Sequence, residues 1–250
     1  MRALLVLGCC WIAACSRQAP PAAEKAAAPP PQYFRVDPAT AGKVSGQVRF
    51  TGKIPPAKRI SMDAEEACQK LHPKPAFDAR VTTGKQNGLA NVFVYIKSGL
   101  EGKTFEPPKT AVVLDQRGCM FVPRVLGLQT GQTLQVKNSD PVTHSVHPMP
   151  QNSREWNQQQ APGAEDLERK VVRSEVMIPV KCNVHSWMHS YLGAVDHPYF
   201  AVTDESGAFS LENLPPGEYM VAAWHESLGE RTERVTIGPK EGKTIAILFQ

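Results

Sequence analysis

The stretch VMIPVKCNVHSWMH, residues 176–189, joins a strand-like run to a group of metal-binding side chains. Cys182, His185 and Met188 stand here in the order Cys-x2-His-x2-Met. Soft sulfur and imidazole ligands together select copper, and two His, one Cys and a weakly bound Met make a blue-copper site. With 6 Cys, 7 His and 7 Met in the chain, this order would arise by chance only about 0.005 times. The stretch predicts a copper centre, and the alternatives are another metal or no metal.

The second imidazole has to come from elsewhere in the chain. Residues 132–138, QTLQVKN, alternate apolar and polar side chains as a half-buried strand does. His144 lies in the loop after this strand, and His147 in the same loop is the alternative to it. Further donors that could compete are Met149, His189 and His197. The predicted metal ligands are His144, Cys182, His185 and Met188.

Short strand-like runs separated by turns occupy the chain from residue 42 onwards. Only residues 62–71 could form a short helix, and no long helical period is present. Many short strands with frequent turns predict an all-β protein built from sandwiches or barrels. The predicted strands are residues 42–50, 90–97, 111–115, 119–123, 132–138, 171–180, 191–195, two within 200–211, 220–225, 234–237 and 243–249.

Length, charge and motifs exclude several classes of function. The chain has 250 residues, which suits one or two domains, and a net charge of only +4 with acids and bases interspersed. Nucleic-acid binding would leave a basic patch or stripe, and the composition has none. The sequence also has no Gly-rich phosphate loop and no Ser/His/Asp constellation at a recognisable spacing. We therefore expect neither a nucleic-acid partner nor an enzyme.

The N-terminus has the pattern of a bacterial export signal. An apolar run over residues 3–14 is too short for a membrane span, which needs about 20 apolar residues. It ends in IAAC, residues 12–15, which resembles the lipobox of bacterial lipoproteins. Residues 1–15 are thus predicted to be a lipoprotein signal peptide with the lipid anchor at Cys15, and Ser16 favours the outer membrane. Simple secretion or an uncleaved anchor is the alternative.

Residues 16–40 form a Pro/Ala-rich linker, and the cysteines beyond it number three. Disulfides persist on the periplasmic side of the cell envelope, where the predicted signal sends the chain. An odd number of cysteines there needs an explanation. A disulfide between Cys68 and Cys119, with Cys182 bound to a metal, resolves the odd number. A different pairing with a stray free thiol is the alternative.

Residues 119–196 resemble a cupredoxin, the family of plastocyanin and amicyanin. The run GQTLQVKN, residues 131–138, and the later His144-Ser145-Val146 are similar to the strand and first-histidine loop of that family. The Cys-x2-His-x2-Met order has the short spacing of amicyanin-type loops. Ser145 stands where the family often has an Asn that braces the ligand loops. The resemblance implies an eight-stranded Greek-key sandwich that carries electrons, with His144, Cys182 and His185 as strong ligands and Met188 as the axial ligand.

The chain from about residue 198 resembles a carboxypeptidase regulatory-like module, a transthyretin-like β-sandwich without catalytic residues. The resemblance rests on TDESGAF, residues 203–209, and LPPGEY, residues 214–219. The first strand of such a module is of the type Gly-x-Val, which Gly46-Gln47-Val48 provides. We predict a cupredoxin-like domain over residues 41–197 and a smaller β module over 198–250. We also expect the early strands to pack with the C-terminal ones, so that the two parts are interleaved.

These features predict an extracytoplasmic, lipid-anchored protein that binds one copper ion and transfers single electrons to a redox partner. Two other functions are compatible with the sequence. The first is copper storage or delivery. The second is a structural or carbohydrate-binding envelope lipoprotein without a metal.

Overall fold

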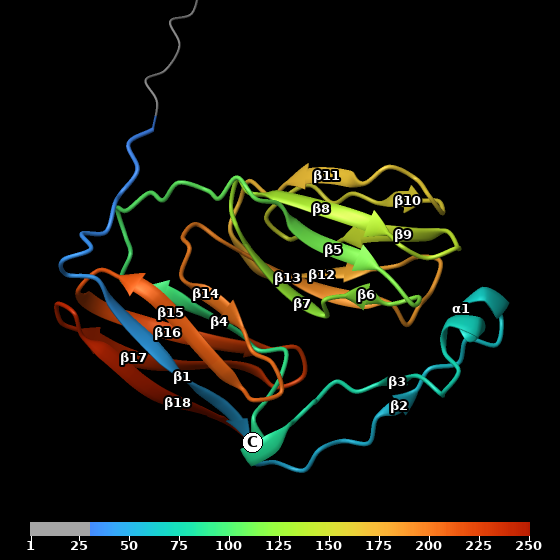
Figure 1. Ribbon diagram of the computed structural model, residues 1–250, viewed down its shortest axis with the longest axis horizontal. Coiled ribbons are helices and arrows are strands. Elements are labelled where there is room, and N and C mark those ends of the chain that lie inside the picture. The colour runs from blue at the N-terminus through green and yellow to red at the C-terminus, as the bar shows by residue number, and fades with distance from the viewer. Residues whose placement is uncertain (1–30) are drawn as a thin grey trace, which may run out of the picture. The chain divides into compact units, whose positions relative to one another are not determined.

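The computed structural model describes residues 31–250, and nearly all of its regular elements are strands (Figure 1). The helical elements described are α1 (Glu66–Leu71) and the single turn η1 (Lys85–Asn87). The predicted all-β fold class is confirmed. The predicted signal peptide, residues 1–15, and residues 16–30 of the predicted linker lie outside the described residues. Within residues 31–250, no helix is long and apolar enough to cross a membrane.

Nine strands in the middle of the chain form a sandwich of two sheets, here called the site sandwich. One sheet has the strand order β10-β9-β12-β13-β7, and the other has the order β11-β8-β5-β6. Side chains from both sheets, such as Leu114, Val136, Val146 and Leu192, are buried in one apolar core. The strands are β5 (Val112–Gln116), β6 (Phe121–Val122), β7 (Val125–Gln129), β8 (Thr133–Asn138), β9 (His144–Pro148), β10 (Gln158–Gln160), β11 (Leu167–Lys170), β12 (Glu175–Lys181) and β13 (His189–Val195).

The chain crosses repeatedly between the two sheets of the site sandwich. β6 and β7 lie in different sheets although only Pro123 and Arg124 separate them, so they act as one bent strand. β8 leads across to β9, β10 leads back to β11, and β11 leads across again to β12. Two neighbouring pairs are parallel, β5 with β8 and β7 with β13. Such long returns between neighbouring strands are typical of Greek-key sandwiches.

The second sandwich, here called the terminal sandwich, combines strands from both ends of the described chain (Figure 1). Its sheets have the orders β15-β1-β18 and β14-β4-β16-β17. β1 and β4 lie in the predicted range 41–197 but pack here, so the two sandwiches are interleaved along the chain. The parallel pairing of β1 with β18 runs from Lys43 opposite Gly242 to Phe50 opposite Phe249. The strands are β1 (Gly42–Phe50), β4 (Phe93–Ser98), β14 (Phe200–Val202), β15 (Ala208–Leu214), β16 (Gly217–His225), β17 (Gly229–Ile237) and β18 (Gly242–Phe249).

Phe93 of β4 forms the centre of the contact between the two sandwiches. Its ring is fully buried and lies against Gly127 of β7 and Gly193 of β13, which are directly paired across their strands. A Cβ atom at either glycine would lie 2.6 Å from a ring carbon of Phe93. Only glycine therefore permits this approach, and the site sandwich is held against β4 by an aromatic side chain.

Residues 58–78, here called the cap, stand in the chain between β1 and β4 of the terminal sandwich but pack beside the site sandwich. The cap contains the short strands β2 (Lys58–Arg59) and β3 (Phe77–Asp78), which pair with each other, and α1 between them. The observed helix is shorter than the predicted residues 62–71. Cys68 is the buried residue of α1, and it forms a disulfide with Cys119. The predicted pairing of these two cysteines is confirmed.

Arg124 links the cap to both sandwiches. Its Nη2 atom donates to Asp78 Oδ1 of the cap at 2.8 Å and to Glu226 Oε2 of the terminal sandwich at 3.0 Å. The same nitrogen lies 2.7 Å from His189 Nε2. Burial raises the pKa of Asp78, but the hydrogen bond and charge of Arg124 outweigh burial and leave that pKa below its usual value.

Candidate metal centre

Strand pairing brings the two predicted ligand loops to one end of the site sandwich. β9 runs antiparallel to β12, with His147 opposite Lys181 and Pro148 opposite Val180. This register places the beginning of β9, which is His144, beside the loop that follows β12. That loop, residues 182–188, is closed at its base by a hydrogen bond from Cys182 N to Met188 O at 3.1 Å and another from Met188 N to His185 O at 3.0 Å.

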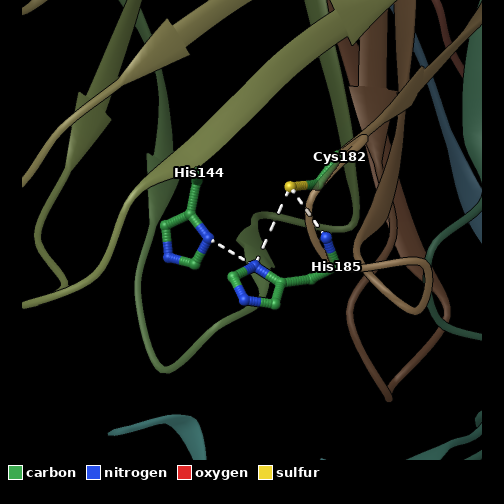
Figure 2. A group of neighbouring side chains, drawn as sticks. All are labelled: His144, Cys182 and His185. Atoms are coloured by element: carbon green, nitrogen blue, oxygen red, sulfur yellow. Dashed lines mark hydrogen bonds between the residues drawn. The ribbon is translucent and has the colours of Figure 1, made fainter. Parts of the chain in front are cut away.

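Three of the predicted ligands meet in a buried cluster. The Nδ1 atoms of His144 and His185 lie 2.9 Å apart, and Cys182 Sγ lies 3.9 Å from His185 Nδ1 (Figure 2). Possible ligand atoms of these three residues all lie within 4.8 Å of one another. The three residues are 0%, 3% and 3% exposed in chain order, so the cluster is closed to solvent. A single ion between them would touch all three.

Hydrogen bonds prepare Cys182 to act as a thiolate. Its Sγ accepts the backbone N–H of Ser145 and that of His185, each at 3.3 Å. Burial raises the pKa of Cys182, but a hydrogen bond from His144 and these backbone N–H groups outweigh burial and lower the pKa to about 6. The thiolate is the form of cysteine that binds metals.

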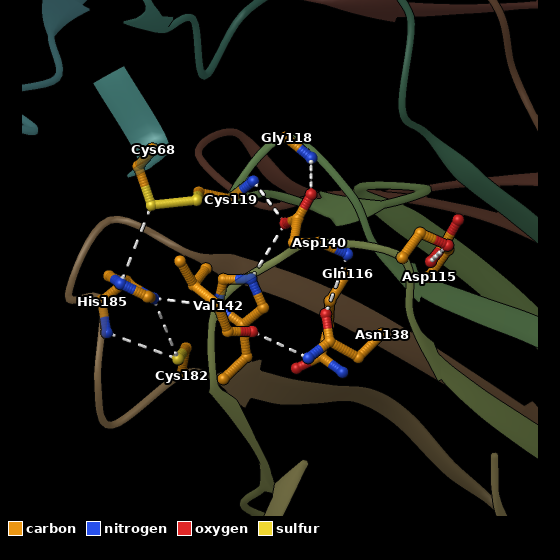
Figure 3. A network of polar contacts seen from close by, with 12 residues as sticks. Cys68, Asp115, Gln116, Gly118, Cys119, Asn138, Asp140, Val142, Cys182 and His185 are labelled. Atoms are coloured by element: carbon orange, nitrogen blue, oxygen red, sulfur yellow. Dashed lines mark hydrogen bonds and ion pairs between the residues drawn. A yellow bond between two sulfur atoms is a disulfide. The ribbon is translucent and has the colours of Figure 1, made fainter. Parts of the chain in front are cut away.

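Asp140 fixes the tautomer of His144 from behind. Its carboxylate accepts the N–H groups of Gly118 at 2.6 Å and Cys119 at 2.7 Å (Figure 3). The same carboxylate lies 2.9 Å from His144 Nε2. A carboxylate only accepts, so His144 Nε2 donates, and Nδ1 is the nitrogen that faces Cys182 and His185. Burial lowers the pKa of His144, but its bonds to Cys182 and Asp140 raise that pKa above its usual value overall. Asp140 was not predicted from the sequence, and its position just after β8 and four residues before His144 was the available signal.

Ser145 braces the two ligand loops. Its Oγ accepts the N–H of Asn183 at 2.7 Å, and its own N–H donates to Cys182 Sγ. The residue thus performs in this chain the bracing that the family resemblance assigns to an Asn. Trp187 closes the other side, because its ring lies 5.0 Å from the ring of His185 and its Nε1 donates to Cys119 O at 2.9 Å.

Met188 is fully buried and belongs to the same core cluster as Cys182. Its backbone is fixed next to both the thiol and the second imidazole by the two hydrogen bonds that close residues 182–188. The structure therefore gathers His144, Cys182 and His185 at one point and buries Met188 in the core that Cys182 also belongs to.

The other histidines considered from the sequence lie outside the cluster. Side chains alternate between the two faces of a strand, so His144 and His147, three residues apart on β9, point in opposite directions. His147 Nδ1 lies 3.1 Å from Asn183 Oδ1, and its Nε2 pairs with Glu155. His189 contacts Arg124, and His197 Nε2 bonds to Ile96 O at 2.8 Å. Strand alternation thus separates the two histidines that the sequence left as alternatives.

The donor set fits copper. It consists of the sulfur of Cys182 and two imidazole nitrogens, and sulfur with imidazole favours copper over magnesium, calcium or manganese. A second group of possible donors consists of Cys119, Asp140 and His144, but the sulfur of Cys119 is bonded to Cys68. Within residues 31–250, Cys182 is the cysteine with a free thiol.

The chain matches no family model and no curated protein sequence. Several solved structures are similar to part of it. The copper-containing nitrite reductase NirK from Thermus scotoductus SA-01 is 18% identical with a TM-score of 0.32, and the match covers 39% of this chain and 24% of the reductase. A purple cupredoxin from Nitrosopumilus maritimus is 14% identical with a TM-score of 0.29, covering 34% of this chain and 99% of that one.

A single-residue mutant of amicyanin in its Cu(I) form is 16% identical with a TM-score of 0.30. That match covers 40% of this chain and 97% of amicyanin. The structural neighbours are thus cupredoxins and a copper enzyme that match this chain over well under half its length. At these scores the matches add no argument about function, which has to come from the geometry of the site.

Proposed function

We propose that this chain is a copper protein of the cupredoxin type that transfers single electrons. The observation that carries the proposal is the buried cluster in which two imidazole Nδ1 atoms, 2.9 Å apart, face the thiol of Cys182. His144, Cys182 and His185 would hold the ion as strong ligands, with Met188 as the weak one. Copper would supply a one-electron couple between Cu(I) and Cu(II).

The surroundings of the cluster support electron transfer because they hold the ligands still. Asp140 fixes the ring of His144, and two backbone N–H groups fix the sulfur of Cys182. A site whose ligands are locked by neighbouring hydrogen bonds rearranges little between oxidation states. Four protein donors in a buried cluster leave no open position for a substrate, which supports a carrier rather than an enzyme.

The proposal is tested by adding Cu(II) to the purified chain and recording its optical spectrum. We expect one copper per chain and an intense thiolate-to-copper absorption band in the visible range. The Cys182→Ser variant should lose the band because it lacks the sulfur. His147→Ala is the matched control, since that imidazole lies outside the cluster, and it should keep the band. A spectrum that Cys182→Ser leaves unchanged would refute the proposed ligand set.

Copper storage or delivery is a second candidate, and the cover over His185 favours it. The ring of this histidine is 3% exposed, because Cys68 of the cap lies 3.8 Å from its Nε2 atom and Trp187 lies over its face. A covered imidazole edge lengthens the path to an external redox partner. Protein-film voltammetry separates the two functions, since a carrier gives a reversible one-electron wave and a storage protein holds Cu(I) tightly without one.

We further propose that the chain is anchored by lipid at Cys15 on the periplasmic side of the cell envelope, in the outer membrane. The support is the IAAC sequence at residues 12–15 together with the Cys68–Cys119 disulfide, a bond that persists outside the cytoplasm. Metabolic labelling with radioactive palmitate in a bacterial host should label the chain, and Cys15→Ser should remove the label. Fractionation should find the labelled chain with the outer membrane.

A further inference from the structure

The Cys68–Cys119 disulfide lies directly against the outer side of the candidate metal centre. Cys68 Sγ is 3.8 Å from Nε2 of His185, the nitrogen that points away from Cys182 (Figure 3). Cys119 Sγ lies within 4.8 Å of a ring nitrogen of His144 and a carboxylate oxygen of Asp140. Both cysteines are 0% exposed. The disulfide therefore places two further sulfur atoms next to the imidazoles.

One further possible donor lies near the same nitrogen of His185. Glu65, the residue before α1, has its Oε2 atom 3.8 Å from His185 Nε2. Cys68 Sγ and Glu65 Oε2 thus each lie 3.8 Å from the same imidazole nitrogen, and Cys119 supplies a second sulfur beside Cys68. While the sulfurs are bonded to each other, neither is a thiolate, and only thiolate sulfur is the strong ligand for soft metals.

We propose that reduction of the Cys68–Cys119 disulfide creates a second copper site, which takes Cu(I). The reductant is a dithiol, either a small molecule or a protein with two neighbouring cysteines. One of its thiolates attacks a sulfur of the disulfide, and its second thiol then displaces the mixed disulfide. Two electrons and two protons pass to Cys68 and Cys119, and the dithiol leaves as its own disulfide. Cu(I) then binds the two sulfurs as thiolates and releases two protons to solvent.

The construction of the cap gives a dithiol access to the buried bond. α1 has six residues, and Cys68 is the one that is buried, so the helix is fastened to the site sandwich by the disulfide and by the contact of its C-cap residue, His72, with Gly118 O at 2.6 Å. Isolated helices of this length are unstable in water, and such segments open locally at low free energy. Ile60 and Met62 remain buried in the core of the site sandwich and keep the cap in place around an opened helix.

Cu(I) fits this second position better than a harder ion does. Two thiolates favour Cu(I), and Cys68 and Cys119 bring two sulfurs together from a helix and a loop, with Cys68 Sγ 3.8 Å from His185 Nε2. The second site lies on the opposite side of His185 from Cys182. It therefore goes beyond the proposed one-copper carrier and makes the copper capacity of the chain depend on the thiol state of its surroundings.

The experiment counts Cu(I) bound to the full-length chain carrying Cys9→Ser, Cys10→Ser and Cys15→Ser, whose thiols are then those of residues 68, 119 and 182. The chain is treated with dithiothreitol without air, the dithiol is removed, and Cu(I) is titrated against a chromophoric chelator. A thiol assay in denaturant should report one thiol before reduction and three after it. We expect one Cu(I) per chain before reduction and two after it, and re-oxidation with diamide should return the number to one.

Two variants separate this inference from the proposed function. Cys182→Ser should bind no Cu(I) when oxidised and one when reduced, because the second site does not use that sulfur. Cys68→Ser combined with Cys119→Ser should bind one whether or not it is treated with dithiol. The inference is overturned if the parent chain shows three thiols after reduction but binds no additional Cu(I), or if re-oxidation leaves the additional ion bound. If the oxidised parent chain bound no Cu(I) and the reduced chain bound one, the result would refute the proposed carrier and support the second site.

Discussion

The two sandwiches are built from the same kind of short strand but use their interiors differently. In the part of the chain that the structure describes, the buried polar side chains of the terminal sandwich are Thr203 and His225, within an otherwise apolar cluster. The site sandwich buries Asp140, His144 and His185 at one end. Buried polar groups destabilise a fold unless they are bonded, and each of these three has a partner. The terminal sandwich therefore depends on apolar burial, whereas the site sandwich also buries a group of mutually bonded polar side chains at one end.

The largest expected effect concerns the contact that joins the two sandwiches. Phe93→Ala should lower the free energy of unfolding by about 3–5 kcal/mol, because it leaves a cavity against Gly127 and Gly193. With this contact gone, urea unfolding followed by fluorescence and by circular dichroism should show two separate transitions. Phe50→Ala is the control, since Phe50 is buried in the terminal core alone, and it should leave a single transition. Coincident transitions in Phe93→Ala would show that other contacts join the sandwiches.

Copper binding should stabilise the site sandwich and change the stability of the terminal sandwich far less. A ligand that binds only the folded state stabilises it by about 4 kcal/mol at a free concentration 1,000 times its dissociation constant. Amide hydrogen exchange of the site sandwich, for example at Leu134 and Val136, should slow by a corresponding factor of about 10³. Exchange at Val221 of the terminal sandwich should change far less. Equal slowing at all three amides would mean that the sandwiches open as one unit.

High pH should lower the stability of the terminal sandwich. Burial raises the pKa of Tyr199 and of Tyr219 to about 12, and both side chains belong to the terminal core. A pKa raised above the unfolded value of 10 adds stability that is fully present below pH 10. That stability is lost as the pH rises toward 12, at most about 2–3 kcal/mol for each residue.

Denaturant unfolding at pH 9 and at pH 11.5 measures this loss. Tyr199→Phe and Tyr219→Phe should each reduce the difference between the two pH values, because phenylalanine does not ionise. Each variant also loses one hydrogen bond, to Asn213 O or to Pro215 O, and that loss is the same at both pH values. If the difference stayed the same in both variants, other groups would cause the alkaline loss.

The smallest expected effect concerns the hydrogen bond by which Asp140 orients His144 in the site sandwich. Asp140→Asn should weaken copper binding by about 10–100-fold, because residues that orient a metal-bound imidazole contribute about that much. Asp115→Asn is the matched control, since that carboxylate accepts from Ser139 Oγ at 2.8 Å and has no contact with a predicted ligand. Competition titration with a copper chelator measures both. An affinity in Asp140→Asn equal to that of the parent chain would remove Asp140 from the site.

Local pattern was enough to predict many of the strands, but not β7, β9, β10 or β11. Apolar and polar alternation in QTLQVKN predicted a strand at residues 132–138, and β8 covers residues 133–138. The early Gly46-Gln47-Val48 motif led to the expected packing of the first strand with the last, which the β1–β18 pairing shows. Residues 148–166 had no strand pattern in the sequence, yet β10 forms there because Gln158–Gln160 pair with Val146–His144 of β9. Pairing with a neighbour, rather than the intrinsic preference of three glutamines, makes that strand.

The sequence by itself indicated the all-β class, because many short strand-like runs alternate with turns. It also indicated the Cys68–Cys119 pairing, because these two of the odd number of cysteines beyond the linker remain once Cys182 is given to a metal, and the Cys-x2-His-x2-Met loop of residues 182–188, because of the spacing of its donors. Only the tertiary structure decided that His144 faces Cys182 while His147 faces away, since that depends on strand register. It also decided that Asp140 lies behind His144 and that Cys68 lies against His185. These contacts join residues from separate loops and from the cap, and no local pattern encodes a distance between segments that meet only when the sheets pack.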